Sequence, residues 1–367
     1  MASTGDPLAR RYRRLLCCYP RAYRRERGDE LVALLLDTAP PGRTTPRLRE
    51  AVDLIRNGMR CRLGRPASST VVAWAALAAV VCGLFSAALS ARVAWETARP
   101  LPGHAETGAI FRTVLPDREP DEITTPSSFF GYYTQPLTLQ ALDNLLLGDG
   151  GEYQQTATGA WAAGPPPAPP EQIAGVAQRR LREAGWHLDG VTVHRSDDCA
   201  DKFCAAVVPV TYTTLDASRG DTLLTVTVNS RPEPDYPYLS IDLRRTTPPL
   251  VLPAAIGGGL LGALAGWLVF GWASRRTETP HPARAVVKVL FGVTLLLWWL
   301  PILVAVPSVA SHHGAEPHPQ WHPLWEWLGQ PTFSLFFLVG SVSALLGIAL
   351  ATLPRRDADR ISTLASG

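Results

Sequence analysis

Acidic and basic side chains are missing from four long stretches of this 367-residue chain. The stretches are 70–91, 250–273, 289–309 and 332–353, and none of them contains Asp, Glu, Lys, Arg or His. Each has about 20 residues or more, the length that a helix needs to cross a hydrocarbon core about 30 Å thick. The sequence therefore predicts four transmembrane helices, because buried helices of water-soluble proteins seldom stay uncharged for so long.

Several catalytic motifs are missing as well. The chain has no phosphate-binding G-x-x-x-x-G-K-[ST] loop, no G-x-S-x-G nucleophile motif and no H-E-x-x-H zinc motif. Ionisable residues inside a membrane usually mark ion or proton pathways, and the four apolar stretches have none. We therefore predict no enzymatic activity, no catalytic residue and no cofactor, and a coupled transporter acting alone is disfavoured.

The charges that are present predict an orientation in the membrane. Residues 1–65 carry 15 Arg against 7 Asp and Glu, whereas residues 92–248 carry 13 basic against 20 acidic residues. Short segments rich in Lys and Arg stay in the cytoplasm. The first apolar stretch begins too late for a cleavable signal and is expected to remain as an anchor. The cell membrane is thus the expected location, with segments 1–65, 274–288 and 354–367 cytoplasmic and segments 92–248 and 310–331 outside.

The N-terminal segment predicts three short helices. Asp6 followed by Pro7 is a helix start, and Pro20 begins a second helix. Pro40-Pro41-Gly42 ends the second helix, and Pro46 opens a third. The third helix has an apolar stripe, which consists of Leu48, Val52, Ile55, Met59 and Leu63. A module of about 60 residues has little core of its own, so its stripes are expected to pack together, on a partner or on the membrane.

Residues ~8–65 also resemble a known kind of segment. The stretches YRRLLCCYPRAYRRERGDELVALLLDTAPPGR and PRLREAVDLIRNGMRCRL resemble the N-terminal permease-prefix or HAAS-like segment of actinobacterial multi-pass membrane proteins. The resemblance implies a cytoplasmic signalling or docking element, linked in some cases to PadR-like regulators. It implies no catalytic residue. A cytoplasmic regulatory protein is accordingly an expected partner, and the basic residues are interpreted as topology signals with no direct binding of nucleic acid.

The region between the first two apolar stretches predicts an extracytoplasmic α+β domain. A helix is expected at 137–147, and the proline-rich segment 161–170 is expected to form an extended linker. Residues 170–185 have helical periodicity, and four alternating stretches follow them. We predict one helix on a four-stranded antiparallel sheet within 170–246.

Cysteine and histidine offer few candidate sites. Cys199 and Cys204 are expected to form a disulfide outside the membrane, and a cation site with His194, Asp197, Asp198 and Asp201 or a solvated hairpin tip are the competing interpretations. Cys17 and Cys18 lack metal-site spacing and are interpreted as reduced thiols. No metal site is predicted, and the weak candidates are His312, His313, His318 and His322 in the Trp-rich loop.

Small residues recur at helical spacing in two of the apolar stretches. They predict close packing between helices, within the chain or in an oligomer. The residues are Ala75, Ala79, Gly83, Ala87, Gly258, Gly262 and Gly266.

Two functions fit the sequence. The first is a non-enzymatic sensor or accessory protein that couples an extracytoplasmic domain to a cytoplasmic docking module. The alternative is a permease-like subunit of a transport complex that needs a separate ATPase.

Overall fold

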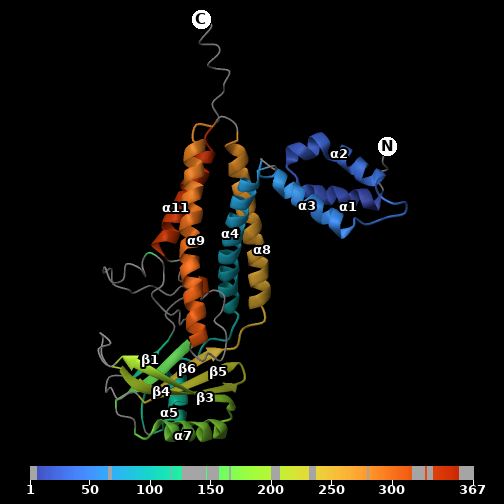
Figure 1. The fold of residues 1–367 in the computed structure, drawn as a ribbon. Coiled ribbons are helices and arrows are strands. Elements are labelled where there is room, and N and C mark those ends of the chain that lie inside the picture. Colours follow the sequence, from blue (N-terminus) through green and yellow to red (C-terminus); the bar gives the residue numbers. More distant parts are fainter. Residues whose placement is uncertain are drawn as a thin grey trace. The chain divides into compact units, whose positions relative to one another are not determined.

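A computed structural model of the chain (Figure 1) contains two compact units, which are described separately. The first unit comprises residues 1–87, 256–302 and 332–367, and the second comprises 88–255 and 303–331. The structure describes residues 6–64, 68–116, 118–125, 146, 157–164, 167–199, 207–230, 237–278, 281–315, 327–328 and 334–354.

The N-terminal module has the three predicted helices and a short 3-10 turn. These elements are α1 (Pro7–Leu15), η1 (Leu16–Cys18), α2 (Arg21–Asp37) and α3 (Leu48–Cys61). The Asp6 carboxylate accepts a hydrogen bond from the Leu8 amide at 2.8 Å, which confirms the predicted start of α1. A small core forms around Tyr12 and contains Leu8, Ala9, Leu16, Tyr19, Val32 and Leu54.

Helix α3 turns a different face toward this core than its apolar stripe predicted. Leu48, Val52 and Ile55 are 80%, 51% and 40% exposed. Leu54 and Gly58 face inward instead, and a Cβ at Gly58 would lie 2.8 Å from the Tyr19 ring. The glycine allows α3 to approach η1 closely, so Leu48, Val52 and Ile55 of the stripe are left on the surface of the module.

An ion pair closes the α2–α3 connection over the core. The Arg43 guanidinium donates to the two carboxylate oxygens of Glu50 at 3.0 and 2.9 Å, and the Tyr12 hydroxyl donates to the same carboxylate at 2.9 Å. The hydrogen bonds from Arg43 are the main reason why the pKa of Glu50 falls from 4.5 to about 2. The ionised carboxylate is therefore favoured in the folded module.

Glu50→Gln should destabilise the module at pH 7 and much less in acid. A lowered carboxyl pKa contributes stability above the unfolded value near 4.5, and this contribution is lost as the pH falls through about 2. The urea concentration at which the module becomes open to proteolysis should be measured with thermolysin at pH 7 and with pepsin at pH 3. Glu26→Gln, on the exposed face of α2, is the control. An equal effect of Glu50→Gln at both pH values would contradict the role of the ion pair.

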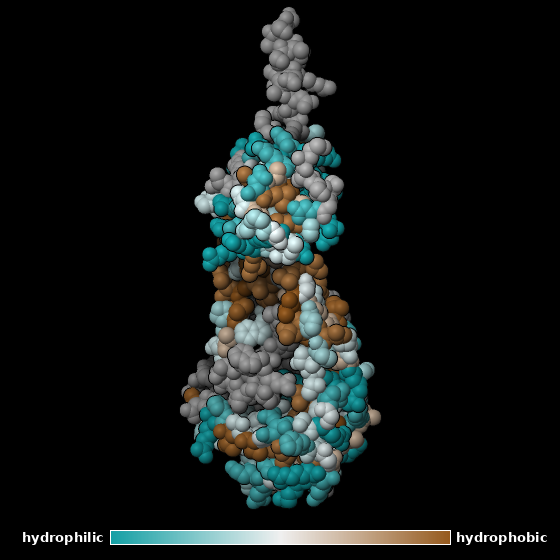
Figure 2. Space-filling model, turned by 90° about the vertical axis from the view of Figure 1, so that its right-hand side faces the viewer, coloured by the Kyte–Doolittle hydropathy of each residue, from teal (hydrophilic) through white to brown (hydrophobic). Residues whose placement is uncertain are grey.

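Three helices are long and apolar enough to cross a membrane. They are α4 (Ser69–Trp95), α8 (Val251–Arg276) and the segment Arg284–Val304 of α9 (Arg284–Ala315), among the described residues. The fourth predicted stretch forms α11 (Leu335–Ala351), which is apolar but has only 17 residues. Apolar side chains gather on the outer surface of these helices (Figure 2). The chain is therefore a membrane protein with three candidate spans. Helix α9 begins at Arg284, five residues before the start at 289 that the sequence predicted.

Helices α4 and α8 meet through small residues. A Cβ at Gly83 would lie 3.1 Å from the Gly259 carbonyl oxygen and 3.2 Å from the Ala263 Cβ. Gly262 lies against Ser86, and a Cβ at Gly266 would lie 2.9 Å from the Cys82 side chain. The contact lies within one chain, and on α8 it passes through Gly259.

The second unit contains a six-stranded antiparallel sheet in the order β1-β2-β6-β5-β4-β3. The strands are β1 (Glu122–Thr124), β2 (Ala157–Ala163), β3 (His187–Cys199), β4 (Val207–Arg219), β5 (Thr222–Asn229) and β6 (Pro237–Arg245). The prediction of four strands was wrong by two. The additional strands β1 and β2 lie before residue 170, outside the range 170–246 in which the sheet was predicted. Trp161 belongs to β2 and pairs with Ser240, so the extended linker cannot begin there.

Two helices pack against each other and on the sheet (Figure 1). Helix α7 (Pro170–Glu183) is the predicted one, and α5 (His104–Val114) was missed. Phe111 of α5 and Leu181 of α7 are fully buried in the same core as Ile241 of β6. The helix predicted at 137–147 lies outside the described residues except for Leu146.

Candidate functional site

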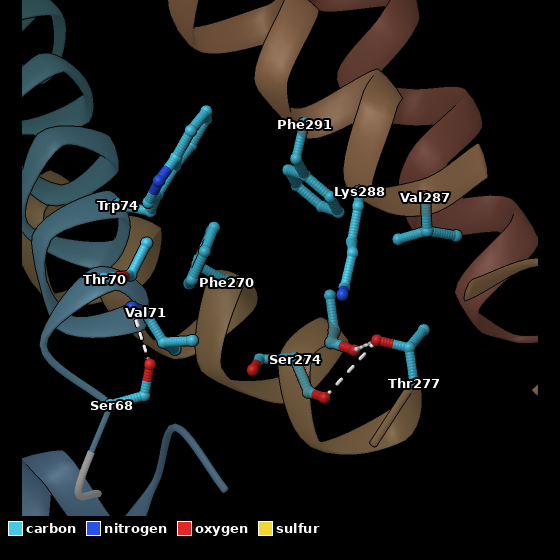
Figure 3. A pocket seen from close by; sticks show the side chains of 11 residues that line it. Ser68, Thr70, Val71, Trp74, Phe270, Ser274, Thr277, Val287, Lys288 and Phe291 are labelled. Carbon is cyan, nitrogen blue, oxygen red and sulfur yellow. Dashed lines mark hydrogen bonds between the residues drawn. The ribbon is translucent and has the colours of Figure 1, made fainter. Parts of the chain in front are cut away.

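A pocket of about 390 Å³ lies among α4, α8 and α9 in the first unit (Figure 3). Its apolar part is formed by the rings of Trp74, Phe270 and Phe291 together with Val71, Ala273 and Val287. Its polar part is formed by Ser68, Thr70, Ser274, Thr277 and Lys288. A site with one apolar and one polar side suits an amphiphilic molecule.

Local structure positions the polar side chains of the pocket. Ser68 lies just before α4, and its hydroxyl accepts a hydrogen bond from the Val71 amide at 3.4 Å. The Thr277 hydroxyl lies within hydrogen-bond distance of the Ala273 and Ser274 carbonyl oxygens, at 2.9 and 3.3 Å. Lys288 follows Val287, which is buried against Ala273 of α8. Packing of Val287 therefore fixes the turn of α9 that carries the ammonium group.

Among the described residues, Lys288 is the one charged residue that lines this pocket. The described lining residues include no His, Cys, Asp or Glu, the side chains that most often bind metal ions. What the pocket offers is apolar contact beside an ammonium group and hydroxyl groups.

The N-terminal module is attached to α8 by a second set of contacts. The Trp267 indole donates a hydrogen bond to the Met59 carbonyl oxygen at 3.1 Å. A Cβ at Gly271 would lie 2.9 Å from the Arg62 carbonyl oxygen, and Leu63 is fully buried. The chain after α3 therefore packs closely on α8, within the first unit.

Arg62 also holds the module together at this end. Its guanidinium donates to the carbonyl oxygens of Cys18 at 2.6 Å and Cys17 at 2.8 Å. These bonds join the end of α3 to η1. The thiols of Cys17, Cys18, Cys61 and Cys82 are free.

In the second unit, a polar cluster joins the chain that follows α4 to the end of β6. Arg99 donates to the Asp221 carboxylate at 2.7 Å, and Arg245 donates to the same oxygen at 3.3 Å. Arg245 is 5% exposed, and its guanidinium also donates to the Pro100 carbonyl oxygen. The cluster of Arg99, Asp221 and Arg245 therefore ties together the two connections that lead to α4 and α8.

The predicted disulfide and histidine sites fall largely outside the described residues. Cys199 ends β3 opposite Val207, but Cys204 lies outside the described residues, and the described residues contain no disulfide. His312 and His313 belong to α9, whereas His318 and His322 lie outside the described residues. Among the described residues no cluster of three or more potential metal ligands is found.

Sequence reasoning missed the residues that join distant segments of the chain within each unit. Trp267 was hidden in an apolar stretch, and Arg62 and Arg245 were counted only as charges. Their partners are backbone carbonyl oxygens or distant residues, which leave no sequence pattern.

Comparison with known protein families, curated proteins and solved structures finds no match to the chain.

Proposed function

We propose that this protein is a non-enzymatic sensor or accessory protein of the cell membrane. In this proposal the α+β domain lies outside, both termini lie in the cytoplasm, and the N-terminal module docks to a cytoplasmic regulatory protein. In this proposal α11 is the fourth membrane span. The polarity of the flanking charges supports this orientation.

The observation that carries the proposal is the attachment of the N-terminal module to α8. The Trp267–Met59 hydrogen bond and the contact of Gly271 with Arg62 join the module to a helix that continues to Val251. Strand β6 ends at Arg245, which is buried in its polar cluster, and five residues separate it from the start of α8. A displacement of β6 can therefore reach the module through one continuous helix.

The exposed stripe of α3 supports a docking role for the module. Leu48, Val52 and Ile55 form an apolar surface flanked by Arg49 and Arg56. Such a surface is typical of helices that bind a partner. The permease-prefix resemblance favours the same interpretation, with a regulatory protein as the partner.

Coupling between the two ends of α8 can be measured by hydrogen exchange. Asp221→Asn weakens the cluster around Arg245, and we expect it to change exchange in α3 by several-fold in the full-length protein. Trp267→Phe keeps the ring and removes the donor, so it should abolish that response. Trp272→Phe, at an exposed position of the same helix, should leave the response intact. If hydrogen exchange in α3 is unchanged by Asp221→Asn, the coupling function is excluded.

Reporter fusions provide the accompanying test of orientation. Fusions at Gly64, Gly150, Pro280, Pro319 and Gly367 should report inside, outside, inside, outside and inside. An inside signal at Gly150 would contradict the proposal, because a sensor needs its domain and its docking module on opposite sides. Recovery of an ATPase as a stoichiometric partner would favour the permease-like alternative.

A further inference from the structure

A basic cleft lies where the N-terminal module meets α8, apart from the pocket of Figure 3. Its volume is about 560 Å³, and it is lined by Pro20, Arg21, Ala22, Arg24, Arg62 and Arg275. The four guanidinium groups come from α2, from the end of α3 and from α8. No Asp or Glu is among the lining residues. Four like charges around one space favour an anion there.

Several hydrogen bonds of these arginines go to neutral groups, which leave the positive charge in place. Arg62 donates to the carbonyl oxygens of Cys17 and Cys18, and Arg24 lies 3.8 Å from the Cys17 thiol. The Nε of Arg24 is buried and has no hydrogen-bond partner among the described residues. A buried donor without an acceptor is costly, and a negative charge in the adjacent cleft lowers that cost.

The first turn of α2 opens into the same cleft. This helix has 17 residues and begins after Pro20, which supplies no side-chain cap, and its first turn has no acidic residue. The N–H groups of a first turn and the helix dipole attract anions, phosphate groups above all. Helix terminus and arginine cluster therefore point to the same kind of ligand from different elements.

We propose that this cleft binds a phosphate group, with Arg21 and Arg24 as its principal side-chain donors. Arginine binds phosphate through paired N–H groups, and several arginines together neutralise the double negative charge of the phosphate. A phosphate in the cleft bridges α2 to Arg62 and to Arg275 of α8. It thus strengthens the attachment of the module to α8, a consequence that rests on the proposed coupling function.

The test is binding of pyrophosphate to the purified full-length protein in a neutral detergent. Isothermal titration should detect binding to the wild type, and Arg21→Gln with Arg24→Gln should weaken it at least tenfold. The matched control is Arg25→Gln with Arg27→Gln, two exposed positions of the same helix that change the net charge equally. Hydrogen exchange at residues 21–24 should slow on binding in the wild type and in the control.

Two further arms identify the source of the phosphate group. In nanodiscs of phosphatidylcholine alone, pyrophosphate should still bind if the natural ligand is soluble. If the ligand is an anionic lipid headgroup, adding phosphatidylglycerol should displace pyrophosphate and protect residues 21–24 by itself. Equal weakening by the two double variants, or no binding to the wild type in any arm, would overturn the proposed site. Because binding is measured on purified protein, these results do not depend on topology or on coupling along α8.

Discussion

Gly262→Leu is expected to separate α4 from α8. A Cβ at this position would already lie 2.6 Å from the Cys82 carbonyl oxygen and closer still to the Ser86 side chain. Backbone cannot move aside as the end of a long side chain can, so the helices must part, at a cost of about 1–3 kcal/mol. The native Cys82 thiol on α4 reports the separation, and its alkylation in purified protein should become at least tenfold faster.

The same helix offers a matched control. A Cβ at Gly257 has nothing within 4 Å, so Gly257→Leu should leave Cys82 as slowly alkylated as in the wild type. Gly262→Ala should give an intermediate rate, because one methyl group meets the same backbone oxygen. If Cys82 is alkylated at the same rate in the Gly262→Leu and Gly257→Leu variants, the described contact between α4 and α8 is wrong.

Phe111→Ala should lower the free energy of unfolding of the α+β domain by about 3–5 kcal/mol. Phe111 is fully buried in the core, between α5 and the sheet. Truncation of its ring removes that apolar contact and leaves a cavity that surrounding strands cannot fill. Pulse proteolysis of the full-length protein in urea should measure the loss as a lower midpoint for cleavage within the sheet.

An exposed residue of the same helix tests whether burial is the cause. His104 lies at the first position of α5 and is exposed, so His104→Ala should change the midpoint little. A small effect of Phe111→Ala would mean that α5 is dispensable for the core. It would also restore the prediction that one helix suffices for the sheet.

The membrane helices could be predicted from the sequence because their signal is local and continuous. Residues 70–91 and 250–273 lack charge over a whole span. Helix α4 contains the first range, and α8 contains all of the second except residue 250. The start of α1 was also predictable, because Asp6 and Pro7 act on the next few residues. Strands β3 to β6 alternate clearly enough that their pairing partners follow in chain order.

The remaining elements depend on contacts between distant residues. β1 has only three residues and becomes a strand by pairing with β2, and α5 is short and mixed in composition. The inward face of α3 could not be predicted from its apolar stripe, because Gly58 rather than a large side chain decides which face meets Tyr19. The basic cleft likewise joins Arg21 with Arg275 through the fold alone.

The position of β6 in the sheet also sets the order in which the domain is completed during synthesis. β6 is the last strand to be made, yet it lies between β2 and β5, and Ala157 at one end of β2 pairs with Arg244. A nascent chain that stops before residue 237 has neither of the ladders that β6 forms, so β2 and β5 each lack one of their two partners. Closing pairs so distant in sequence is slow compared with closing a hairpin. The domain thus acquires its core only when the ribosome has nearly reached α8, so release of that helix and folding of the domain become consecutive events.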